Sequence, residues 1–64
     1  MENPIYRVVR DEKRERAARY REQAAHLEMI ASAEAARTDR ERLLEMAIQY
    51  QGLARRLEDD LSRS

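Results

Sequence analysis

The stretch AARYREQAAHLE, residues 17–28, returns thirty positions later in the chain as AIQYQGLARRLE, residues 47–58. Both copies contain Ala-x-x-Tyr-x-x-x-Ala-x-x-Leu-Glu, so small and bulky apolar residues alternate at spacings of three and four. Residues at these spacings lie along one stripe of an α-helix. The pattern predicts two helices that approach closely at alanines while Tyr and Leu fill the remaining space. Convergent packing would produce the same likeness, so the repeat is no evidence of common descent.

The apolar stripe continues on both sides of the repeat and fixes the extent of the helices. Neither proline nor glycine interrupts the second helix before Gly52. We predict helices over about 10–36 and 39–62. The predicted intrahelical seam consists of Ala17, Tyr20, Ala24, Leu27, Ala31, Leu43, Ala47, Tyr50, Ala54, Leu57 and Leu61.

The connection between the two helices is predicted from a capping box. Thr38 is followed three residues later by Glu41, a spacing at which each side chain accepts from the other residue's backbone N–H. The second helix should therefore begin near Asp39. A connection of a few residues forces the helices antiparallel. The predicted fold is all-α, an antiparallel two-helix hairpin formed by residues 10–64, with Tyr20 near Ala54.

Residues 1–9 differ in pattern from the rest of the chain. Ile5, Val8 and Val9 are β-branched, and together with Tyr6 they show no clear helical phase. Two conformations are compatible with this segment. Asn3 before Pro4 is a suitable cap for a helix that starts at the proline, or the segment lies extended over the open end of the hairpin. We expect a flexible or extended arm.

Size and composition favour self-association. A chain of 64 residues buries only about 60% of the surface that it exposes when unfolded, so a core of this size is marginal. Disulfides are excluded as a support because the chain has no cysteine. Hydrophobic residues make up 42% of the chain, but ten of them are alanines, which bury little area. We expect oligomerisation to supply the missing stability.

A second apolar set lies off the seam and predicts an interface. A contiguous apolar patch is rarely left open on a monomer. The simplest cover is a second copy of the hairpin, which gives a homodimeric four-helix bundle. An unidentified protein partner is the alternative cover. The predicted interface consists of Met29, Ala33, Ala36, Leu44 and Ile48.

Charge argues against nucleic acid as the main partner but leaves it as an alternative. Thirteen Lys and Arg balance thirteen Asp and Glu. Residues 7–21 hold seven basic and three acidic residues, which point around most of a helix and are typical of a solvated surface. A dimeric hairpin of this length also resembles, in architecture alone, the small plasmid RNA-modulating Rop protein. The contacts that this alternative implies are Arg7, Arg10, Lys13 and Arg14.

Residues with catalytic or metal-binding chemistry are sparse, so we expect no enzyme activity and no cofactor. His26 is the single histidine and follows Glu22 by four residues, a spacing typical of a surface pair. Bundle metal sites use Glu-x-x-His, but Gln23 stands at that position here. Tyr20 and Tyr50 are interpreted as core packing with a hydroxyl at the rim.

The N-terminal sequence bears on cellular location. It lacks the apolar stretch of a signal peptide, and no run of residues is long and apolar enough to span a bilayer. We expect a cytoplasmic protein with no membrane contact.

The chain resembles a group of small uncharacterised helical proteins of alphaproteobacteria. That group pairs Tyr-x-x-x-Ala-x-x-Leu with a downstream Leu-Leu-x-x-Ala-x-x-Tyr-x-x-Leu-Ala. The matching residues are Tyr20, Ala24, Leu27, Leu43, Leu44, Ala47, Tyr50, Leu53 and Ala54. The Asp-Pro often present in the turn of the group appears here as Asp39-Arg40. The resemblance implies a helical hairpin and carries no activity. The sequence as a whole predicts a non-enzymatic module for self-association or protein–protein interaction.

Overall fold

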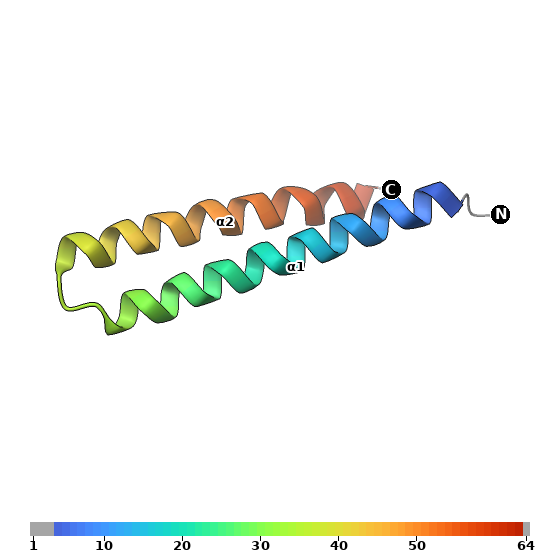
Figure 1. Cartoon of the computed structure of the whole chain (residues 1–64). Coiled ribbons are helices and arrows are strands. Elements are labelled where there is room, and N and C mark those ends of the chain that lie inside the picture. The colour runs from blue at the N-terminus through green and yellow to red at the C-terminus, as the bar shows by residue number, and fades with distance from the viewer. Residues whose placement is uncertain (1–3, 64) are drawn as a thin grey trace.

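The computed structural model describes residues 4–63, which form two helices joined by a short connection (Figure 1). Helix α1 spans Pro4–Ala33 and helix α2 spans Arg37–Arg63. The helices run antiparallel and pack against each other along most of their length, and the Cα atoms span 54 × 15 × 11 Å. The predicted all-α hairpin is confirmed.

The N-terminal part of α1 corrects the expectation of a flexible or extended arm. The helix begins at Pro4, so residues 4–9 are helical, while residues 1–3 of the expected arm lie outside the described residues. Proline suits the first helical position because its φ is fixed and its missing N–H would have no partner there. β-Branched residues cost only about 0.5 kcal/mol each in a helix, so Ile5, Val8 and Val9 do not prevent the helix from starting at Pro4. As a result, α1 runs past the end of α2 at the open end of the hairpin (Figure 1).

The rings of Tyr20 and Tyr50 fix the register of the two helices. Their centroids lie 5.9 Å apart at an interplanar angle of 38°. Tyr20 thus meets Tyr50 itself, about one turn nearer the connection than the predicted neighbour Ala54. Counting seven residues along each helix toward the connection places Leu27 level with Leu43. In this part of the seam bulky residues therefore lie opposite bulky residues, and Ala24 lies beside Ala47.

The structure places every residue of the predicted seam between the helices. Ala17, Ala24, Leu27, Ala31, Ala47 and Ala54 are buried. Tyr20, Leu43, Tyr50, Leu57 and Leu61 are half-buried. Leu27, at 9% exposed, is the one large side chain that residues 4–63 bury. Because alanine contributes little buried area, a seam built this way stabilises a lone hairpin weakly.

The connection, residues 34–36, begins with a tightened last turn of α1. The Glu34 backbone N–H donates to the Ala31 carbonyl at 3.2 Å, a bond between residues three apart. The next helix begins with the Arg40 N–H donating to the Ala36 carbonyl at 3.0 Å. Ala36 is therefore the N-cap of α2.

The predicted capping box is wrong, because α2 begins two residues earlier than the sequence indicated. Thr38 lies inside the first turn of the helix. The Glu41 carboxylate instead accepts from Arg37 Nε at 3.0 Å, an i,i+4 pair that extends the helix toward the connection. The cap position itself is held by alanine, which has no side-chain oxygen to accept from the free backbone N–H groups.

Ala36→Ser should increase the free energy of unfolding by about 1 kcal/mol, because a serine oxygen at the N-cap accepts from a backbone N–H of the first turn. Urea denaturation at one fixed protein concentration measures the change. Thr38→Ala is the matched control and should have little effect. A loss of about 1 kcal/mol in Thr38→Ala together with no gain in Ala36→Ser would mean that α2 starts at Thr38.

Gly52→Ala should also stabilise the protein, by about 1 kcal/mol. Gly52 lies inside α2, its φ is not positive, and a Cβ built on it meets nothing within 4 Å. The glycine therefore lowers the helix propensity of α2, and no close contact in the hairpin requires it. Thermal unfolding followed by circular dichroism measures the gain, and a lower melting temperature would contradict open space at this position.

Candidate interaction surface

The first flank of the seam is closed by polar contacts between the helices. Arg21 on α1 pairs with Glu58 on α2, with Nη2 to Oε1 at 2.6 Å and Nε to Oε2 at 3.3 Å. Seven residues nearer the connection on each helix, Gln51 Nε2 donates to Glu28 Oε1 at 2.5 Å. A heptad step returns to the same helix side. We call Arg21, Glu28, Gln51 and Glu58 the paired flank.

The two-pronged contact between Arg21 and Glu58 shifts the pKa of both groups. The hydrogen bond from Arg21 has the largest effect and holds the pKa of Glu58 below its ordinary value of 4.5; burial opposes it less strongly, and the charges of Arg21 and Arg55 add smaller lowering effects. The same hydrogen bond and charge raise the pKa of Arg21. Both side chains remain nearly half exposed, so solvent weakens the pair.

The stabilisation by Glu58 should disappear in acid. Its pKa is lower in the folded than in the unfolded state, so the pair stabilises the fold above about pH 4.5 and loses this effect as the pH falls through the folded-state pKa. We therefore expect the wild type to have a higher melting temperature than Glu58→Gln at pH 7, and the difference to shrink as the pH falls through the folded-state pKa of Glu58. An equal difference at neutral and acid pH would contradict the pairing.

The second flank is apolar and open. Ile30 follows Glu28 by two residues and Leu53 follows Gln51 by two, which places both about 200° around their helices from the paired flank. Met46 lies seven residues before Leu53 and shares its side. These three side chains, the apolar flank, are 40–41% exposed.

A recess on α2 adds to the apolar flank. It has a volume of about 230 Å³ and is lined by Met46, Gln49, Tyr50 and Leu53. The recess carries no charged residue in its lining, and its floor includes the half-buried ring of Tyr50. It can accept an apolar side chain from another helix.

The predicted interface residues are all exposed but do not gather on one surface. Ile48 lines a different recess together with Arg21 and Gln51 of the paired flank. Leu44 precedes Gln51 by seven residues and lies on that same side. The residues of the predicted interface are Met29, Ala33, Ala36, Leu44 and Ile48, with Met29 at 67% and Ile48 at 65% exposed.

The remaining three of those residues lie elsewhere. Ala33 follows Ile30 by three residues, on the apolar side, while Met29 follows the exposed Glu22 by seven on the outer side of α1. Ala36 belongs to the connection. Sequence reasoning missed the apolar flank, although the heptad positions beside the seam would have indicated it.

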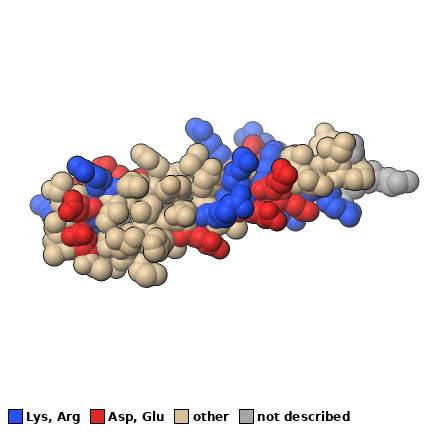
Figure 2. Space-filling view, in the orientation of Figure 1, with Lys and Arg blue, Asp and Glu red and all other residues tan. Residues whose placement is uncertain are grey.

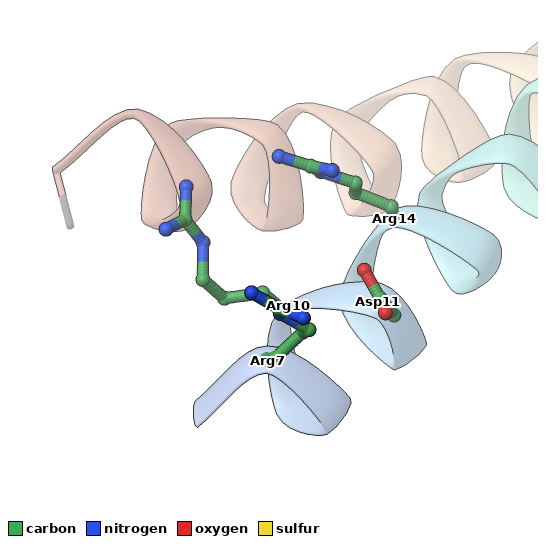
Figure 3. Close-up of a pocket in the computed structure, with 4 residues that line it drawn as sticks. All are labelled: Arg7, Arg10, Asp11 and Arg14. Carbon is green, nitrogen blue, oxygen red and sulfur yellow. The ribbon is translucent and has the colours of Figure 1, made fainter. Parts of the chain in front are cut away.

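The basic N-terminal segment gathers three arginines around one recess. Arg7, Arg10 and Arg14 line it together with Asp11, and its volume is about 250 Å³ (Figure 3). All four residues come from the first turns of α1. Lys13, the fourth basic residue of the alternative, lines no part of this recess and is half-buried on the seam.

Charge is unevenly divided along α1. Residues 7–21 hold seven basic and three acidic residues, whereas residues 22–34 hold three glutamates and no Lys or Arg. One face of the molecule shows a broad uncharged area on the half near the connection, then a belt of charged side chains, then a smaller uncharged area at the N-terminal end (Figure 2). The hairpin therefore has a positive open end and a negative α1 near the connection.

Other candidate sites are weakly supported. Among residues 4–63, no three His, Cys, Asp or Glu side chains come close enough together to hold a metal ion, and His26 and Glu22 are exposed. Tyr20 and Tyr50 pack ring against ring within the seam. Neither described helix has an apolar stretch that could cross a lipid bilayer.

The chain was compared with models of protein families, with curated proteins and with solved structures. None of these comparisons found a match.

Proposed function

We propose that this protein is a non-enzymatic assembly module whose hairpin associates with a second copy of itself. The apolar flank supports this proposal. Ile30, Met46 and Leu53 lie beside the seam at heptad positions that face a neighbouring helix in a four-helix bundle. The other flank carries the polar pairs Arg21–Glu58 and Gln51–Glu28 beside its exposed leucine and isoleucine, so it is less suited to apolar packing than the apolar flank.

The composition of the seam supports the same function. Alanines occupy most of its buried positions, and Leu27 is the one large side chain buried among residues 4–63. A hairpin with so little buried apolar area gains stability when its exposed flank is removed from water. Association and folding are then coupled, as expected for a small obligate oligomer.

Absolute molar mass by light scattering across a dilution series tests the proposal. We expect twice the mass of the 7.6 kDa chain at high concentration and dissociation on dilution with loss of helicity. A fully helical monomer at every concentration would contradict self-association and would make the apolar flank a site for a different protein.

A second candidate function is association with nucleic acid, favoured by the recess of Arg7, Arg10 and Arg14. Three arginines on successive turns can contact consecutive phosphates. RNA retention that falls steeply with salt and is lost in the double variant Arg7→Gln with Arg14→Gln would support this candidate. Retention that is unchanged in the double variant would exclude the recess as the contact.

A further inference from the structure

We propose that two hairpins dock with their α1 helices antiparallel, so that the N-terminal end of each α1 covers the connection end of the partner's apolar flank. This inference rests on the proposed self-association and adds its topology. The N-terminal end of α1 is called the overhang and consists of Ile5, Tyr6, Val8 and Val9.

The overhang is a second exposed apolar surface. Ile5 is 72%, Tyr6 66%, Val8 56% and Val9 42% exposed. These residues lie on the first two turns of α1, at the end of the helix that runs past the end of α2 (Figure 1). Four exposed apolar side chains on two turns of helix form a docking surface for another helix.

Helix phase places the overhang and the apolar flank on the same side of α1. Val9 precedes Ile30 by 21 residues, which is three heptads. A two-fold axis that crosses α1 midway between these residues brings Val9 of one copy opposite Ile30 of the other, and the reverse. The same axis brings Arg16 opposite Gln23, which lie one heptad apart between Val9 and Ile30 on that side of α1. The overhang of each copy then lies against the connection end of the partner's α1.

Charge favours the same direction. The half of α1 with the overhang has seven basic and three acidic residues over 7–21, and the half near the connection has three glutamates over 22–34. Antiparallel docking sets the basic half of each helix over the acidic half of the partner's helix. Parallel docking would set basic over basic, which costs free energy. The opposite charge also raises the rate of encounter.

The area required for a stable dimer is met when the whole length of the hairpin takes part. With Leu27 level with Leu43, Leu53 lies level with Ala17, so the apolar flank from Leu53 to Ile30 covers only about 20 Å of helix. A standard interface buries roughly 800 Å² per copy, and the hairpin offers a face of that order only over its whole length, 54 Å by its Cα extent. Full-length contact is achieved when each overhang reaches the partner's connection end.

Cysteine cross-linking tests the topology directly, because the chain has no cysteine of its own. Val9→Cys and Ile30→Cys are prepared as single variants, mixed, and oxidised mildly. We expect a disulfide between the two variants, and little cross-linking of either variant with itself. In the antiparallel arrangement two copies of position 9 are about 31 Å apart, far beyond the reach of a disulfide. Glu22→Cys, on the outer side of α1, is the control that should not cross-link with Val9→Cys.

Arg16→Cys with Gln23→Cys provides a second pair on the same side of α1, in case one substitution weakens the dimer. Cross-linking of either pair, with the control negative, supports the proposal. Dominant cross-linking of Val9→Cys with itself would overturn it, because the overhangs would then lie side by side. Light scattering on the same samples separates the two failures. Dimers in which neither pair cross-links overturn the topology alone, and monomers at every concentration overturn the proposed self-association as well.

Discussion

Leu53→Glu is expected to leave the hairpin monomeric at concentrations at which the wild type is dimeric. Leu53 belongs to the apolar flank and lines its recess. A carboxylate there would be buried without a partner on association. The substitution weakens association by on the order of 2 kcal/mol and is present twice in each dimer. The dissociation constant is therefore expected to rise by about 1000-fold. Light scattering across a dilution series measures it.

Leu44→Glu is the matched control for that experiment. Leu44 and Leu53 are the same residue type on the same helix and are equally exposed, at 41%. They differ in the side of α2 on which they lie, since Leu44 is on the paired flank. The control should keep the dimer. Dissociation in Leu44→Glu with a dimer in Leu53→Glu would show that the wrong flank has been assigned to the interface.

Leu27→Ala is expected to lower the free energy of unfolding by about 2 to 5 kcal/mol, the range for a large-to-small change in a core. Leu27 packs with Ala24, Ala47, Leu43 and Tyr50 and is the one large buried side chain among residues 4–63. A loss of this size approaches the whole stability of so small a domain. Circular dichroism at several protein concentrations should show a chain that is largely unfolded when dilute.

Two further variants define what that loss means. Leu27→Met preserves the volume and should cost less than about 1.5 kcal/mol. Leu57→Ala removes a half-buried leucine of the same seam and should cost less than Leu27→Ala. Equal losses in Leu27→Ala and Leu57→Ala would mean that the seam is buried evenly along its length, contrary to the structure.

The hairpin and its seam could be predicted from the sequence because each depends on a local repeat. The alternation of Ala with Tyr and Leu sets the helix side that is buried, and the absence of proline and glycine from most of the chain sets the helix lengths. Tyr20 and Tyr50 occupy the same place in the repeat, and they meet because the two helices run antiparallel.

The helix ends could not be predicted as well, because they depend on small competing free energies. Thr38 is a good N-cap by residue type, but the pair between Arg37 and Glu41 accompanies an earlier start with alanine at the cap. The β-branched residues near Pro4 disfavour helix only slightly, and the proline favours a helix start.

The interface set was chosen from sequence by apolar character away from the seam, without regard to flank. Ile48 and Ala33 satisfied that criterion but lie on different sides of the hairpin. The two flanks are told apart by the pairing of Arg21 with Glu58, a contact between residues 37 positions apart. Such a contact is visible only once the helices are placed together.

The phase difference between the two halves of the seam protects the chain against domain swapping. Ala31 and Ala47 are 16 residues apart, so in one uninterrupted helix they would lie about 160° from each other. If the connection straightened, the buried sides of α1 and α2 would point in nearly opposite directions. Two such rods could exchange partners only by leaving one seam in water. The break at residues 34–36 thus makes closure on itself the favourable way for one chain to bury both stripes.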